Sequence, residues 1–159
     1  GVSDAAAITF GTSRQRPEET AMSGIPAGLR RLVKERANGR CEYCGLAQVG
    51  QEATFHIDHI QPVSTDGPTV AENLALACTS CSLRKEARRT AVDSVTGRKV
   101  RLFHPRRQVW SDHFRWRGNI VIGLTSTGRA TVAALQMNRP SILIIREEEA
   151  ERGRHPPPV

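Results

Sequence analysis

The sequence predicts a small α+β protein that is organised by a metal site. Three observations support this fold class: two matched Cys-x-x-Cys pairs, a β-like segment between them, and helical patterns before and after them. The chain has 159 residues, of which 38% are hydrophobic and only 4% aromatic. This length suits one compact domain with tails. Because the apolar core is thin, we expect an additional source of stability.

The cysteines provide that source. The two pairs, Cys41/Cys44 and Cys78/Cys81, have identical spacing. Two residues between thiolates let both sulfurs of a tight turn face one tetrahedral ion, and two such turns complete a four-sulfur zinc site. The alternative is a pair of disulfides, which an exported protein would favour. Since no export signal is apparent, we predict structural zinc.

The remaining elements follow from local patterns. Pro26 and the apolar residues after it predict a short amphipathic helix that ends at Gly39. Residues 54–60 predict a strand, and 82–91 a second, polar helix. Further along, we expect a hairpin around Gly118-Asn119, a helix over 130–137 and a closing strand at 142–145.

The two ends of the chain lack such patterns. Residues 1–24 mix small and charged residues without a period, so we expect a flexible leader. Residues 147–159 are charged and end in three prolines, which predicts a flexible, solvated tail. Between these ends, the sequence divides into a core at 25–92 and a basic extension at 93–146 that packs on it.

Positive charge is concentrated in one segment. Residues 84–107 contain nine Lys or Arg and two acidic residues, a local +7 that equals the net charge of the whole chain. Such a segment is either a solubilising face or a surface that contacts phosphates. Under the second interpretation, Phe103, His104, Trp110 and Trp116 are available to stack on bases or wedge between them. The candidate nucleic-acid contacts are Arg84, Lys85, Arg88, Arg89, Arg106 and Arg107.

The 33 residues between the cysteine pairs carry the chemistry. Hydrolysis of a phosphodiester requires a base for the attacking water and a cation that neutralises charge on the phosphate. His59 is suited to be the base, and Asp58 is an oxygen ligand suited to Mg²⁺ or Mn²⁺. Neighbouring strand residues point to opposite faces, so both converge only if the strand ends there. Pro62 supplies such an ending.

The order of residues resembles the HNH endonuclease family, also described as the His-Me finger or ββα-metal nucleases. The resemblance spans about residues 25–92 and lies in Asp58-His59, a glycine-containing loop, Asn73-Leu74 and the second cysteine pair at the start of a helix. It implies a zinc-stabilised ββα-metal core with an amino-terminal helix and a carboxy-terminal hairpin and helix. It also implies that His59 is the general base, that Asp58 binds the catalytic metal and that Asn73 ties the loop and orients the histidine.

The sequence departs from the family at one position. The last His or Asn of the family pattern, a second ligand of the catalytic metal, is Ser82 here. A hydroxyl is a weaker Mg²⁺ ligand than an amide or imidazole, so activity is expected to be reduced. His56, two residues before Asp58 on the same strand face, is a conceivable substitute ligand or an ordinary packed histidine.

Three functions therefore compete. The first is a metal-dependent DNA endonuclease, a class that includes enzymes that nick a single strand. The second is a catalytically silent, zinc-stabilised DNA-binding module, and the third is a zinc-organised protein-interaction domain. We expect an intracellular protein without a membrane span, because apolar stretches such as Ile142–Ile145 are far shorter than the roughly 20 residues that a bilayer requires.

Overall fold

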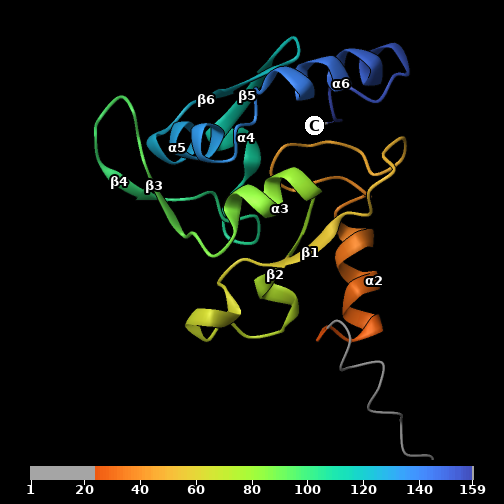
Figure 1. Ribbon diagram of the computed structural model, residues 1–159, viewed down its shortest axis with the longest axis vertical. Coiled ribbons are helices and arrows are strands. Elements are labelled where there is room, and N and C mark those ends of the chain that lie inside the picture. The colour runs from red at the N-terminus through yellow and green to blue at the C-terminus, as the bar shows by residue number, and fades with distance from the viewer. Residues whose placement is uncertain (1–23, 159) are drawn as a thin grey trace, which may run out of the picture.

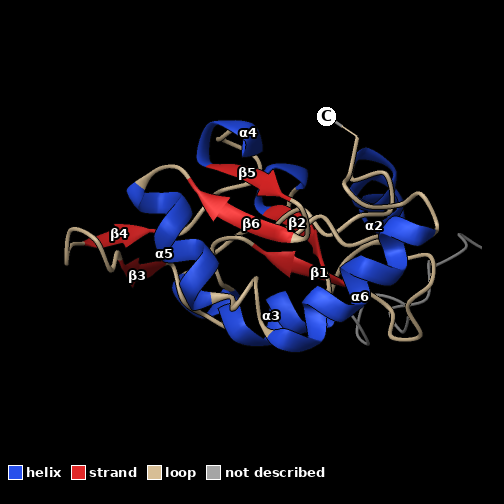
Figure 2. Ribbon diagram, turned by 90° about the horizontal axis from the view of Figure 1, so that it is seen from above, coloured by secondary structure: helices blue, strands red, loops and turns tan. Residues whose placement is uncertain are grey.

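The computed structural model describes residues 24–158 (Figure 1). The expected leader, 1–24, therefore lies outside the described residues except for Gly24. The described chain contains helices and small antiparallel sheets, which confirms the α+β class. Figure 2 shows the β1–β2 and β5–β6 pairs in the middle of the molecule and the β3–β4 pair at one end, with helices α3, α5 and α6 along one side.

The centre of the fold is a strand pair with a helix against it. Strand β1 (His56–His59) pairs antiparallel with β2 (Leu74–Ala77), and His56 lies opposite Ala77 while His59 lies opposite Leu74. All four β2 side chains are buried. The strands are joined by a loop with two short 3₁₀ turns, η1 (Val63–Thr65) and η2 (Ala71–Asn73).

An amino-terminal helix supports this pair. Helix α2 (Ala27–Arg36) packs on β2 and places Val33 in the core. The Arg36 guanidinium donates to the carbonyl oxygens of Ala71 and Leu74, so it fixes the chain where η2 leads into β2. Positive φ at Asn38 and Gly39 ends this region, as the glycine predicts.

The second expected helix differs from the prediction at both ends. Helix α3 spans Thr79–Lys85, rather than 82–91. It begins early because the Cys78 sulfur accepts a hydrogen bond from the Cys81 backbone N–H and caps the helix. It ends early because Glu86 has φ 47° and ψ −127°. The following residues form strand β3 (Thr90–Val92), which pairs with β4 (Lys99–Arg101).

The carboxy-terminal part adds a hairpin and three helices. Helix α4 (Trp110–His113) leads into β5 (Phe114–Arg117), which pairs with β6 (Ile120–Gly123) across the predicted turn. Helix α5 (Ser126–Ala134) follows and packs on β6. The helix expected over 130–137 therefore exists but starts and ends earlier.

The prediction of a closing strand at 142–145 is wrong. These residues lie in helix α6 (Pro140–Glu151), in which Ile142, Arg146 and Glu149 are buried while Ile144 is 61% exposed. This spacing belongs to one face of a helix rather than to a strand. The buried Arg146 donates to the carbonyl oxygens of Asn119 and Met137.

The expectation of a solvated tail is also corrected. Residues 147–151 belong to α6, and Arg154 forms an ion pair with Glu149. The His155 ring lies edge-on against Trp116, with 4.6 Å between ring centroids. The charged residues and prolines made this segment look solvated in the sequence. It packs on the fold because the charges of Glu149 and Arg154 are paired with each other.

One hydrophobic cluster joins the two halves of the chain. It includes Val33, Tyr43 and Leu76 from the core together with Phe114 and Ile142 from the extension. The Trp110 indole N–H donates to the Tyr43 carbonyl oxygen at 2.8 Å. A buried carboxylate, Asp93, accepts two hydrogen bonds from Arg129 at 2.9 Å each and ties the β3–β4 turn to α5.

Glu86 offers a test of the helix end. Its backbone lies in a region that glycine occupies readily and other residues adopt at a cost of about 1–3 kcal/mol. Because the side chain is exposed, Glu86→Gly should increase the free energy of unfolding by about 1 kcal/mol, measured by chemical denaturation. The same change at the exposed helical Glu147 should instead cost about 1 kcal/mol. Destabilisation by both changes would contradict the strain at Glu86.

Candidate functional site

The four cysteines lie together, as their spacing predicts. They are buried and unpaired in disulfides, and their sulfur atoms all lie within 4.8 Å of one another. The Cys44 and Cys78 sulfurs are 3.7 Å apart. A tetrahedral zinc ion with bonds of about 2.3 Å needs sulfurs separated by roughly 3.8 Å. The cluster can therefore hold a zinc ion.

The two cysteine turns have matching local structure. In each, the first sulfur lies near the backbone N–H of the second cysteine, at 3.5 Å for Cys41 and 3.4 Å for Cys78. Gly45 follows the first turn with φ 77°, the conformation for which a small residue was expected. Such N–H groups stabilise the negative charge of a thiolate.

The first turn is also joined to β2. The Glu42 backbone N–H donates to the Leu76 carbonyl oxygen, and the Leu76 N–H donates to the Glu42 carboxylate, both at 2.8 Å. The cysteine cluster thus fixes the strand pair from one side and α3 from the other.

Strand β1 presents its side chains to two different surroundings. His56 and Asp58, two residues apart, face helix α3, where His56 contacts Ser82 and Asp58 contacts Lys85. His59 contacts Thr69 in the β1–β2 loop instead. The structure therefore gathers His56, Asp58 and Ser82 at one cleft and places His59 on the other side of the strand end.

Asp58 is a half-buried acid with one cationic partner. Its Oδ2 atom lies 3.2 Å from the ammonium of Lys85, whose side chain is 2% exposed. Burial raises the pKa of the Asp58 carboxyl, whereas the charge of Lys85 opposes the rise. Within residues 24–158, Oδ2 accepts no hydrogen bond. A carboxylate oxygen of this kind suits a hard cation.

Ser82 lies in the middle of α3, because the helix begins at Thr79 rather than at Ser82 as the sequence predicted. Its hydroxyl is 3.0 Å from His56 Nδ1. Together with Asp58 these groups offer one carboxylate, one imidazole and one hydroxyl at the same cleft, which Arg30 also lines. Mg²⁺ is commonly held by one or two carboxylates, with water and substrate phosphate as its other ligands, and Mn²⁺ also accepts imidazole. The donor set fits such an ion.

Asn73 holds the loop between the strands. Its side-chain N–H₂ donates to the carbonyl oxygens of Pro68 at 2.8 Å and Gln61 at 3.1 Å, while its Oδ1 accepts from the Gln61 backbone N–H at 2.8 Å. Asn73 is 7% exposed. One side chain therefore closes both ends of the loop that carries Thr69.

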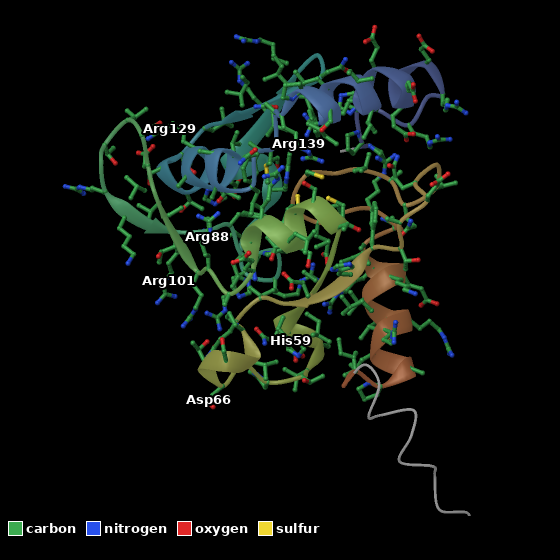
Figure 3. The ribbon with its side chains drawn as sticks, in the orientation of Figure 1. His59, Asp66, Arg88, Arg101, Arg129 and Arg139 are labelled. Carbon is green, nitrogen blue, oxygen red and sulfur yellow. The ribbon has the colours of Figure 1, made fainter. Side chains whose placement is uncertain are left out.

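His59 is held at one ring nitrogen. Its Nε2 lies 2.9 Å from the Thr69 hydroxyl. In the described part of the chain, no group bonds to its Nδ1. Figure 3 shows His59 beside the loop that contains Asp66, below α3. The ring is thus oriented by the loop and keeps one nitrogen available.

Comparison with protein families agrees with this geometry. Residues 41–88 match the family described as HNH endonuclease. This segment is similar to an HNH domain. It contains both cysteine pairs, the β1–β2 pair and α3. The comparison with curated proteins gave no match, and neither did the comparison with solved structures.

The six basic residues predicted to contact nucleic acid, which lie within and after the matched segment, fall into two groups. Lys85 is paired with Asp58, and Arg106 forms an ion pair with Glu42. Arg84 donates to Ser80. Arg88 and Arg89 lie after α3 with exposed side chains, and Arg107 is exposed in the loop before α4. Of the six candidate contacts, Lys85 and Arg106 therefore have their charges neutralised within the protein.

The aromatic side chains considered for base stacking pack within the protein. Phe103 is 3% exposed and lies edge-on against Phe114. Trp110 stacks on Trp116 with 5.4 Å between ring centroids, and the Arg146 guanidinium lies over Trp116. His104 and the buried Phe103 line an arginine-rich cleft, and of these two only His104 is partly exposed.

Sequence reasoning missed two residues near the site. Thr69, the partner of His59, gave no signal because a threonine in a loop has many roles. Arg101 lies on β4 beside the same cleft as Arg88 and Arg89, and its isolation between apolar residues concealed this position.

Within residues 24–158, none of the helices has the length and apolar character that crossing a bilayer requires.

The Lys85–Asp58 pair gives a prediction about stability. Lys85→Met leaves a buried carboxylate without its cation, so unfolding should become easier by about 3 kcal/mol at pH 7.5 without added Mg²⁺ or Mn²⁺. The raised pKa of Asp58 rises further in this variant. Because a raised pKa favours the protonated folded protein, the loss should shrink as the pH falls toward 5.

Thermal denaturation at both pH values measures this effect. Lys99→Met, on the exposed β4 strand, is the matched control and should change stability little at either pH. An equal loss at pH 5 and pH 7.5 for Lys85→Met would contradict a role for the pair in holding the Asp58 charge.

Proposed function

We propose that this protein is a metal-dependent endonuclease that hydrolyses phosphodiester bonds in DNA. The observation that carries the proposal is the end of strand β1, where an oriented imidazole, His59, directly follows a buried carboxylate, Asp58, inside an HNH domain. A phosphodiester that lies across this strand end would meet both groups. An intracellular site of action follows from DNA as the substrate.

His59 is proposed as the general base. For its Nδ1 to accept a proton from water, its Nε2 must carry hydrogen, and the Thr69 hydroxyl then accepts a hydrogen bond from it. The loop contact is compatible with the tautomer that the reaction requires, because the Thr69 hydroxyl can accept this hydrogen bond. Asn73 acts as a positioning residue, because it fixes the loop that holds Thr69.

Asp58 is proposed as the main ligand of the catalytic cation, with Ser82 and His56 beside it. When bound, Mg²⁺ or Mn²⁺ supplies positive charge to the phosphate and to the departing oxygen. Lys85 keeps the carboxylate ionised in its buried position. The short hydroxyl of Ser82 is already engaged with His56, which supports a weakened activity. Nicking of one strand is the form of cleavage that we propose.

A second candidate function is a catalytically silent DNA-binding module. One observation favours it. The Asp58 charge is already balanced by Lys85, and the Ser82 hydroxyl already has a hydrogen-bond partner in His56. Both candidates share the zinc-held framework and the basic surface, so they differ only in whether DNA is cut.

Relaxation of supercoiled plasmid with Mg²⁺ or Mn²⁺ tests the proposal. The chain should nick the plasmid, and His59→Ala should reduce the rate by about 10²–10⁴-fold, the contribution of a general base. Ser82→Asn should increase metal-dependent cleavage about tenfold, since an amide oxygen is a better ligand.

Two matched variants control these changes. Ser80→Asn makes the same substitution in the same helix, and His155→Ala removes a histidine near Trp116; neither should alter cleavage. Activity that persists unchanged in His59→Ala would reject the mechanism. No cleavage by either the original chain or Ser82→Asn, together with salt-sensitive binding, would establish the silent module instead.

A further inference from the structure

We propose that a cleft outside the metal site binds the phosphate backbone of duplex DNA. One wall is the β1–β2 loop, with Gln61, Pro68 and Val70. The other wall comes from the chain after α3 and from the segment after β4. It is rich in basic side chains: Arg88, Arg89, Arg101, His104 and Arg107. Most of this second wall lies beyond residues 41–88, so the HNH match does not include it.

The charge of this cleft is strongly unbalanced. Arg89, Arg101 and Arg107 are exposed, and none forms an ion pair within the described residues. Arg88 bonds to two carbonyl oxygens but stays exposed. Glu72 is the one acidic residue of the lining. Phosphates satisfy such guanidinium groups with charge-assisted hydrogen bonds.

The arginines converge rather than scatter. Burial lowers the pKa of His104, and the charges of Arg107, Arg101 and Arg89 lower it further. All three arginines line the same cleft as this imidazole. Like charges held together repel one another, so an anion in the cleft relieves a cost that the free protein carries.

Other arginines of the same chain show the contrast. Arg106 pairs with Glu42, Arg129 with Asp93 and Arg154 with Glu149. Each of these guanidinium groups ties two parts of the fold together. The unpaired guanidinium groups of Arg89, Arg101 and Arg107 thus lie at the cleft, while Arg98 lies outside it and the paired arginines serve the fold.

The cleft shares a wall with the proposed catalytic base. Pro68 and Val70 line the cleft, and Thr69 between them contacts His59. Asn73 also lines the cleft while it holds this loop. Figure 3 shows Arg88 and Arg101 on the side of the molecule toward the β3–β4 hairpin, with His59 across the loop. A backbone held by the arginines would therefore run toward the strand end.

This inference rests on the proposed function, because the bound duplex is the substrate of the nuclease. Its test measures binding without cleavage, so that the two ideas fail separately. A fluorescently labelled DNA duplex is titrated with the His59→Ala protein in a series of salt concentrations. The same background carries either Arg101→Gln with Arg107→Gln or a control pair, Arg117→Gln with Arg152→Gln. The control arginines are exposed and lie at the β5–β6 turn and at the end of α6.

Each lost phosphate contact should reduce the slope of log affinity against log salt by about 0.9. The cleft pair should therefore lower the slope by about 1.8 and weaken binding at 0.1 M salt roughly 60-fold. The control pair should change binding by less than about threefold. Because all four side chains are exposed, the variants should keep the thermal stability of the parent.

Two results would overturn the proposal that this cleft binds DNA. One is affinity and salt slope that are unchanged in the cleft pair. The other is an equal loss in both pairs, which would mean that the duplex responds to net charge alone. If the cleft pair weakens binding but no metal supports cleavage, the cleft stands and the nuclease proposal fails.

Discussion

Four buried sulfur atoms hold together the parts of this molecule that carry its chemistry. Strands β1 and β2 have four residues each, and an isolated pair of that size is marginal in water. The cysteine cluster joins the two ends of the segment that contains them. A zinc ion in such a cluster contributes about 10–16 kcal/mol in small zinc domains. That is comparable to the whole stability of a typical domain.

The same sulfur cluster also sets the position of the candidate site. Cys78 follows β2 directly and caps α3, so Ser82 and Lys85 face β1 from a fixed helix. On the opposite edge, Glu42 from the first cysteine turn bonds to Leu76 and pairs with Arg106. The extension thus reaches the strand pair through a residue of the cysteine turn. Fold and site depend on one local structure.

The site carries features that lower stability. Asp58 and Lys85 remove two charges from water, and a buried pair of this kind is often no more stable than apolar residues of similar size. Free arginines around His104 repel one another. Both features are explained if the site binds a cation and a polyanion. The cation would supply positive charge at Asp58, and the polyanion would supply negative charge at the arginines.

The sequence predicted the framework better than the details. Cysteine spacing, the Gly118-Asn119 turn and the β1 segment depend on local chemistry, and the structure has all three elements. Helix α6 was mistaken for a strand because a short run of Ile and Leu fits a buried strand and a helix equally well. Only the partners Asn119 and Met137 of Arg146 show which face is buried.

The residues of the candidate site likewise fall into those that the sequence could indicate and those that only the structure could indicate. Asp58, His59, Asn73 and Ser82 are recognisable from their order along the chain, whereas Thr69 is recognisable only from its contact with His59. Charge counting placed Arg106 and Lys85 among the nucleic-acid contacts, but tertiary ion pairs engage both. It counted Arg101 in the basic segment but did not name it as a contact, and this residue lies on a strand that the sequence did not predict. Long-range pairing decides which basic residues remain free.

Measurement of zinc content together with folding tests the central claim most directly. The purified chain should contain one zinc ion, and removal of this ion by a chelator should abolish the cooperative thermal transition, with recovery when zinc is restored. Cys78→Ser should neither retain zinc nor show that transition. A metal-free chain that keeps its cooperative unfolding and dispersed amide spectrum would contradict a fold built on the four sulfurs.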